Sequence, residues 1–116
     1  MSGRKVFVAN DHAGLDLKPA LFEVLRELGY EVHDLGAQTT ASVDYPDFAH
    51  AVAKRVVDEG ALGLLVCGTG IGMSIAANRH KGVRAAVVSD TFSARATRLH
   101  NDANVLCIGG KIIGSV

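Results

Sequence analysis

Hydrophobic residues gather in five short runs along the chain, and polar or glycine-containing segments separate these runs. Three runs, at residues 6–9, 62–66 and 85–88, are strongly apolar and have the length of strands buried on both faces. Two weaker runs lie at residues 31–35 and 104–108. The pattern therefore predicts five β-strands.

Segments with helical spacing lie between the predicted strands. The clearest has five apolar residues on one helical face: Leu17, Leu21, Val24, Leu25 and Leu28. Gly29 follows them, where a C-terminal cap is expected. Three more helices are predicted at residues 46–57, 71–79 and 92–99, and Pro46 is tolerated in the first turn of its helix.

This alternation of strands and helices predicts one domain over residues 1–116. Alternating units imply right-handed crossovers and a parallel sheet with helices on both faces. We therefore expect an α/β protein, a three-layer α/β/α sandwich with a five-stranded parallel Rossmann-like sheet. Ligands of such sheets bind beyond the carboxyl ends of the strands, so the segments after the strands are the candidate sites.

Composition and charge exclude several classes of protein. Twelve basic and twelve acidic residues give a formal net charge of zero, so no overall field draws the chain to nucleic acid or to an anionic membrane. No segment approaches the roughly 20 apolar residues of a membrane span, and the N-terminus lacks a signal-peptide core. We expect a cytoplasmic protein whose Cys67 and Cys107 stay as thiols.

The most informative segment, CGTGIGMS at residues 67–74, follows a predicted strand and opens a helix. Its glycines let the backbone approach a ligand, and a helix N-terminus presents unpaired N–H groups to an anion. The glycine pattern alone also fits a turn that packs a strand against a helix. Cys67 faces that N-terminus and can be a base or a nucleophile, or simply a small buried residue. Cys107 has no such loop behind it and is assigned to the core.

Two histidines also lie beside predicted strands. His12 follows Asp11 after the first strand, and His100 precedes the fifth, so we expect both at the same edge of the sheet, where a histidine can move protons. The alternatives are an incidental histidine beside a helix-capping Asp11, and a surface residue at a helix end for His100. The remaining histidines lack polar clusters and are assigned structural roles: His33, His50 and His80.

Other site chemistries find little support in the sequence. No pair of cysteines or histidines has metal-site spacing, so neither a metal nor another cofactor is expected. Ser74 and Ser89 lack the nucleophile-elbow pattern of a hydrolase. A redox thiol at Cys67 would need a resolving cysteine, and none is near it in sequence. In residues 44–47, Asp44 can cap the helix that follows.

Five motifs, in order between Val6 and Gly114, resemble those of the ribose-5-phosphate isomerase B and galactose-6-phosphate isomerase family. They are DHAG at 11–14 with Lys18, DYPD at 44–47, CGTGIG running into SIAAN over 67–78, GVRA at 82–85 and HNDANVL at 100–106. The resemblance implies metal-free aldose–ketose isomerisation through an enediolate. Cys67 matches the base that moves a proton between C1 and C2. Its pairing with Met73 is similar to the cysteine-base branch, since the other branch has a glutamate where Met73 stands.

The resemblance also implies roles for the other site residues. Thr69 and His100 match positions that open the furanose ring. Positions that bind substrate are matched by Asp11, His12, Gly68, Gly70, Ile71, Gly72, Ser74, Asn101 and Lys111. The backbone amides of residues 70–74 would hold the enediolate oxygen, and such donors are commonly worth about 3 kcal/mol each. Family sites combine residues of two subunits, so a homodimer, or a dimer of dimers, is expected.

Two features depart from the family pattern. Relatives usually carry arginine at the position of Lys111, and lysine pairs with phosphate as a point charge without the bidentate fork of arginine. Family chains also continue into a further helix and a tail whose arginines clamp the phosphate. We therefore expect that a C-terminal segment is missing after Val116.

The leading hypothesis is interconversion of ribose 5-phosphate and ribulose 5-phosphate, a step of the pentose phosphate pathway. The expected partners are a small phosphorylated sugar and a second copy of the chain, without nucleic acid or membrane. The alternatives are isomerisation of another sugar phosphate, such as a tetrose or hexose phosphate, and a catalytically silent module that binds a sugar phosphate or a nucleotide.

Overall fold

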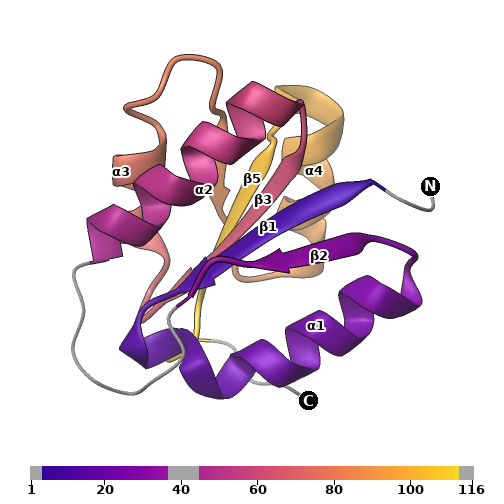
Figure 1. Cartoon of the computed structure of the whole chain (residues 1–116), viewed down its shortest axis with the longest axis vertical. Helices are drawn as coiled ribbons and strands as arrows, with labels where there is room; N and C mark the ends of the chain where they lie inside the picture. Colours follow the sequence, from indigo (N-terminus) through magenta and orange to yellow (C-terminus); the bar gives the residue numbers. More distant parts are fainter. Residues whose placement is uncertain (1–3, 37–44, 113–116) are drawn as a thin grey trace.

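The computed structural model describes residues 4–36 and 45–112, and it contains a five-stranded parallel sheet between two layers of helices (Figure 1). The strands are β1 (Lys5–Asn10), β2 (Glu31–Asp34), β3 (Leu62–Cys67), β4 (Ala85–Val87) and β5 (Val105–Gly109). Their order across the sheet is β2-β1-β3-β5-β4, and every neighbouring pair is parallel. The predicted three-layer α/β/α sandwich is confirmed.

The helices follow the predicted segments closely. They are the 3-10 helix η1 (His12–Leu17) and the α-helices α1 (Lys18–Glu27), α2 (Tyr45–Glu59), α3 (Ile71–Ala77) and α4 (Thr91–Asn101). Gly29 has a φ of +90°, and its N–H bonds to Arg26 O while that of Tyr30 bonds to Leu25 O, so the predicted glycine cap is present. The predicted capping residue Asp44 lies outside the described residues.

One helix is shorter than predicted. The pattern predicts a helix over residues 71–79, whereas α3 ends at Ala77. The side chain of Asn78 explains the end, because its Oδ1 accepts the N–H of Ala85 at 2.8 Å and its Nδ2 donates to the Ala85 carbonyl at 2.9 Å. These two bonds tie the helix end to the first residue of β4, and so they set where the chain turns back into the sheet.

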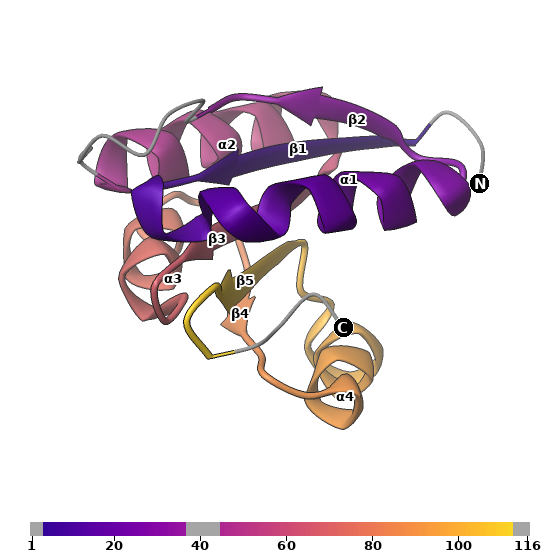
Figure 2. The same cartoon turned by 90° about the horizontal axis from the view of Figure 1, so that it is seen from below.

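Side chains alternate between two cores, one on each face of the sheet. In β1, Phe7 and Ala9 pack with α2 and α3, whereas Val6 and Val8 pack on the side of α1 and α4. The two views show α2 and α3 together on one face and α1 and α4 on the other (Figures 1 and 2). Burial on both faces explains why the interiors of the central strands are apolar.

The strand order places a topological switch between β1 and β3. From β1 the chain goes to β2 on one side, and it then crosses to β3 on the other side of β1. The segments after β1 and β3 therefore part at the carboxyl edge, which is where open α/β sheets bind ligands. The N–H of Asp11 donates to the Val66 carbonyl at 3.1 Å, so the segment after β1 is joined to the end of β3.

Candidate active site

The glycine-rich loop after β3 folds back over the thiol of Cys67. Cys67 is the last residue of β3, and its Sγ accepts a hydrogen bond from the backbone N–H of Gly70 at 3.1 Å. Gly70 has a φ of +85°, in the left-handed region that favours glycine. A donor that points at the sulfur stabilises negative charge there. The structure therefore places a thiol and a turn of backbone donors side by side, at the switch point of the sheet.

The segment after β5 holds this loop from the other side. The N–H of Gly110 donates to the Cys67 carbonyl at 2.7 Å, and the N–H of Lys111 donates to the Gly68 carbonyl at 3.1 Å. A Cβ at Gly109 would lie 2.7 Å from Thr69 Cα, so the two backbones approach as closely as glycine allows. The ends of β3 and β5 thus fix the position of the loop.

Two backbone amides in the loop remain for a ligand. Three of the five amides at residues 70–74 donate to neighbours: Gly70 to Cys67 Sγ, Ile71 to Thr69 Oγ1 at 3.3 Å, and Ser74 to Gly70 O at 3.2 Å. The amides of Gly72 and Met73 make no hydrogen bond within residues 4–36 and 45–112. Of the amides at residues 70–74 that were expected to hold an oxyanion, these two have no partner in the described ranges.

The segment after β1 brings a buried carboxylate and an exposed imidazole to the same edge. Asp11 is 7% exposed, and His12, the first residue of η1, is exposed. A Cβ at Gly14 would lie 2.7 Å from Val66 Cγ1, so η1 packs directly against β3. Asp11 is therefore held beside the strand that ends in Cys67.

Asn10 is a polar residue of this edge that sequence reasoning did not single out. Its side chain is fully buried, and Nδ2 donates to the Asp11 carbonyl at 2.9 Å. The Oδ1 atom has no hydrogen-bond partner in the described part of the chain. Buried acceptors of this kind usually carry a partner, so Asn10 offers an acceptor beside Asp11. Its place directly after the predicted strand at residues 6–9 was the only signal in the sequence.

An ion pair between a buried lysine and a more exposed aspartate supports the segment after β1, and the sequence pointed to only one of its members. Lys18 is 7% exposed, and its Nζ lies 2.9 Å from Asp34 Oδ2. Asp34 Oδ1 also accepts the N–H of Gly36 at 2.9 Å. The pair therefore links the start of α1 to the end of β2. Lys18 belongs to the quoted motifs, whereas nothing in the sequence marked Asp34.

Most of the predicted site residues meet at the carboxyl edge of the sheet. These are Asp11, His12, Cys67, Gly68, Thr69, Gly70, Ile71, Gly72, Ser74 and Lys111. Ser74 is buried, and its hydroxyl donates to the Ile71 carbonyl at 2.7 Å, so this side chain supports the helix turn. The side chains of His12, Thr69 and Lys111 are exposed.

His100 and Asn101 lie elsewhere, and the prediction that His12 and His100 share one edge is wrong. The helix α4 begins after the carboxyl end of β4 and runs back to the start of β5, so its last residues lie at the amino edge. Asp102, next in sequence, lines a hollow with Arg4 and Gly60, which lie near the amino ends of β1 and β3. Within one chain, His100 is therefore at the opposite end of the strands from Cys67.

Cys107 lies in the core, as predicted, but close to Cys67. It is fully buried, and desolvation, with a smaller contribution from Cys67, raises the pKa of its thiol to about 12. It lies on β5 opposite Leu65 of β3, two residues before the level of Cys67. The sequence showed no cysteine near Cys67, whereas the sheet brings one to the adjacent strand. Both remain free thiols.

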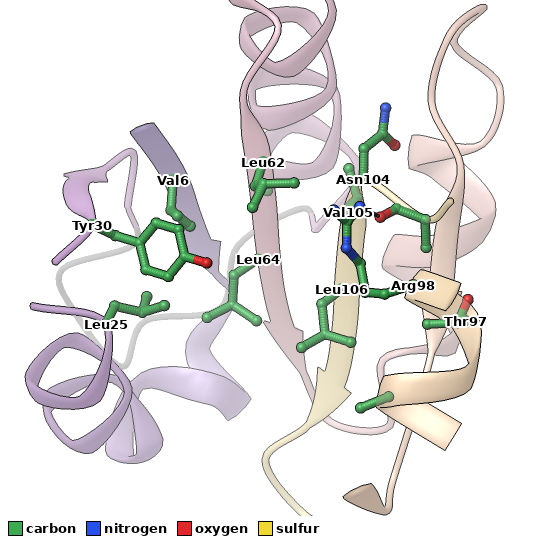
Figure 3. A pocket seen from close by; sticks show the side chains of 13 residues that line it. Val6, Leu25, Tyr30, Leu62, Leu64, Thr97, Arg98, Asn104, Val105 and Leu106 are labelled. Atoms are coloured by element: carbon green, nitrogen blue, oxygen red, sulfur yellow. Dashed lines mark hydrogen bonds between the residues drawn. The ribbon is translucent and has the colours of Figure 1, made fainter. Parts of the chain in front are cut away.

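An apolar hollow of the described chain lies away from this chemistry. It measures about 310 Å³ on the sheet face between α1 and α4 (Figure 3). Aliphatic side chains of three neighbouring strands point into it, among them Val6, Leu64 and Leu106. It contains no carboxylate, thiol or imidazole, so we do not assign the reaction to it.

The described residues form neither a metal cluster of three or more ligands nor a membrane-spanning helix. Within residues 4–36 and 45–112, no three His, Cys, Asp or Glu side chains gather as a metal site would require. In the same ranges, every helix is too short or too polar to cross a bilayer.

Known proteins match both the sequence and the fold. The family model for ribose/galactose isomerases matches residues 6–116. YwlF of Bacillus subtilis is 51% identical over 112 residues, 95% of this chain and 75% of that protein. Ribose-5-phosphate isomerase B of Escherichia coli is 44% identical over 112 residues, 96% of this chain and 75% of that protein.

A solved structure of ribose-5-phosphate isomerase B from Mycoplasma genitalium, with bound ribulose 5-phosphate, is 42% identical with a TM-score of 0.93. The alignment covers 99% of this chain and 78% of that one, so this chain spans about three quarters of the length of its relatives. By sequence and by fold, the chain belongs to the ribose/galactose isomerase family of enzymes.

Proposed function

We propose that this chain is a sugar-phosphate isomerase that interconverts ribose 5-phosphate and ribulose 5-phosphate, with Cys67 as the base. The observation that carries the proposal is the thiol at the switch point, next to two backbone amides that have no partner in the described chain. The relatives named ribose-5-phosphate isomerase B, one with bound ribulose 5-phosphate, support the choice of substrate.

The geometry fits a proton transfer between neighbouring carbons. The Cys67 thiolate takes the proton from C2 of the open-chain aldose, and the electrons move to the carbonyl oxygen to give an enediolate. The thiol then returns the proton to C1, while a hydroxyl proton passes from O2 to O1. Donors on the Gly72 and Met73 amides stabilise the negative oxygen when it forms. Cys67 is 6% exposed, and this low exposure keeps bulk water from the transferred proton.

The remaining residues at the carboxyl edge are assigned to binding and ring opening. Thr69 is assigned to opening the furanose ring, and Asp11 to a hydrogen bond with a sugar hydroxyl. His12 and Lys111, both exposed at this edge, are assigned to the phosphate. A neutral imidazole or a lysine ammonium can hold phosphate in this way, although neither forms the bidentate fork of arginine.

A second copy of the chain is proposed to complete the site. His100 and Asn101 lie at the amino edge of their own sheet, away from Cys67. Both side chains are exposed at the end of α4, so they are free to reach a neighbouring subunit. In a homodimer, His100 of one subunit assists ring opening above Cys67 of the other.

Replacement of Cys67 tests the base. Cys67→Ala is expected to lower kcat by about 10²- to 10⁴-fold, the usual range for loss of a general base. Cys107→Ala is the matched control, because its thiol is fully buried and is not assigned to the site. Isomerase turnover is measured with circular dichroism as a check of folding. Wild-type turnover by a folded Cys67→Ala protein would remove Cys67 from the mechanism.

Two further measurements identify the preferred substrate and test whether the chain catalyses proton transfer at all. Turnover on four-, five- and six-carbon sugar phosphates ranks the possible substrates, and a preference for a tetrose or hexose phosphate would replace the pentose assignment. Incorporation of solvent deuterium into the sugar reports proton transfer directly. Saturable binding of ribose 5-phosphate without any exchange would instead identify a silent binding module.

A further inference from the structure

A histidine pair joins α2 to the turn that follows α3. His50 lies in the second turn of α2, and His80 lies three residues after the end of α3. His50 Nδ1 is 2.6 Å from His80 Nε2, and the ring centroids are 4.8 Å apart with the rings tilted by 55°. The two helices pack side by side on one face of the sheet (Figures 1 and 2). Two imidazoles that are 30 residues apart in sequence therefore present ring nitrogens to one another.

Solvent reaches this pair, and the isomerase site does not use it. His50 is exposed and His80 is half-buried. Neither residue belongs to the segments that surround Cys67. A hydrogen bond between two imidazoles needs a hydrogen on one nitrogen and a lone pair on the other. The position between the two nitrogens is therefore one that a proton occupies and that another cation can take.

We propose that His50 and His80 form a two-histidine site for a divalent transition-metal ion such as Ni²⁺ or Zn²⁺. Neutral imidazole is the commonest protein ligand of these ions. The metal replaces the hydrogen between the rings and accepts a lone pair from each nitrogen. Water completes the coordination, because the described residues contain no third His, Cys, Asp or Glu in a common group with the pair.

The observed geometry is close to what coordination requires. Metal–nitrogen distances of about 2.0–2.1 Å and a tetrahedral angle put two ligand nitrogens about 3.3 Å apart. From 2.6 Å, the two nitrogens need to separate by only about 0.7 Å, which rotation of the exposed His50 side chain can supply. The helices therefore stay in place when the ion binds.

The charges near the pair set an upper limit on affinity. Arg79 and Lys81 flank His80 in sequence, and Lys54 lies one turn after His50 in α2. These cations oppose the charge of a metal ion. With half the ligands of a four-ligand zinc site, the pair is expected to bind Ni²⁺ with a Kd of about 1–100 µM.

Calorimetric titration of the tag-free protein with NiCl₂ tests the site. Wild type is expected to bind one Ni²⁺ per chain, and His50→Ala and His80→Ala are each expected to weaken binding at least tenfold. His33→Ala is the matched control, because it removes an imidazole from β2 and leaves the pair intact. Nickel is used because it does not oxidise the two thiols.

A thermal measurement separates the metal site from a structural hydrogen bond. Ni²⁺ is expected to raise the Tm of wild type and of His33→Ala by several degrees, through its preference for the folded state. His80→Gln can keep a hydrogen bond to His50 but supplies no imidazole, so its Tm should not respond to the ion. A wild-type Kd weaker than about 1 mM, or unchanged Ni²⁺ binding in both alanine variants, would overturn the proposal.

Discussion

Cys67 and Cys107 lie on neighbouring strands and belong to the same core, yet their surroundings differ. Cys67 is at the end of its strand and accepts a hydrogen bond from the loop amide of Gly70. Cys107 is inside its strand, where burial is the main cause that raises its pKa. A strand end and a strand interior thus give the two thiols different surroundings within one protein.

This difference predicts the reactivity of Cys107. With a pKa of about 12, its thiolate is a minor species at pH 8, on the order of one part in 10⁴. Iodoacetamide at pH 8 is therefore expected to leave Cys107 unmodified in the folded protein, as read by peptide mass spectrometry. In denaturant, where burial is lost, Cys107 should react like a free cysteine. Rapid modification of Cys107 in the folded protein would contradict the assigned environment.

Alanine substitutions at Gly70 and Gly60 separate the cost of a positive φ from the cost of a steric clash with β5. Both have positive φ, but a Cβ at Gly70 would lie 3.0 Å from the Ile108 carbonyl carbon, whereas nothing lies within 4 Å at Gly60. Gly70→Ala is expected to lower the free energy of unfolding by about 2–4 kcal/mol, from left-handed strain plus overpacking. Gly60→Ala should cost about 1 kcal/mol, from strain alone. Urea unfolding measures both, and equal losses would show that the contact with β5 is unimportant.

Among the helices, α4 has a charged cap whose effect depends on pH. Asp90 accepts the N–H of Ser93 at 2.7 Å, and this bond, together with one from the Ser93 hydroxyl, lowers the pKa of its carboxyl. A lowered pKa stabilises the fold above the ordinary carboxyl pKa of about 3.9, and the gain is lost as pH falls through the folded-state value. The start of α4 is therefore expected to weaken in acid.

Asp90→Asn isolates this charge, because asparagine can still cap the helix. At pH 7 the wild type is expected to have the higher urea midpoint. The difference between the two proteins should shrink below about pH 4 as Asp90 takes up its proton. A difference that stays constant from pH 7 to pH 3 would show that the carboxylate charge does not contribute.

Helices and strands could be predicted from local patterns in the sequence. Contacts between side chains that are distant in sequence could not. The five strands and four helices follow from apolar runs and helical spacing, and Gly29 marked its helix end correctly. His100 was placed at the wrong edge because the prediction used the order of the elements along the chain and ignored the direction of the strands. A crossover helix ends at the amino edge of the sheet, where the next strand starts. The contact of His50 with His80 depends on packing between two helices, and no spacing rule covers it.

At the scale of the whole molecule, the proposed use of both Cys67 and His100 in one site would make that site depend on assembly. In one chain, the strands of the sheet separate Cys67 from His100. A site that uses both residues therefore requires two copies, each contributing the edge that the other lacks. In such a dimer, each chain would supply Cys67 to one site and His100 to the other.

Mixing two inactive variants tests that statement. Cys67→Ala and His100→Ala are each expected to lose most of their turnover. If Cys67 acts with His100 of the partner, a mixed dimer carries one site with both substitutions and one site with neither. Random reassociation after equal mixing makes half of the dimers mixed, so about a quarter of wild-type turnover should return. Turnover is measured before and after denaturation and refolding of the mixture, with each variant refolded alone as the control. If turnover does not rise on mixing while a dimer still forms, the two residues do not act across the interface.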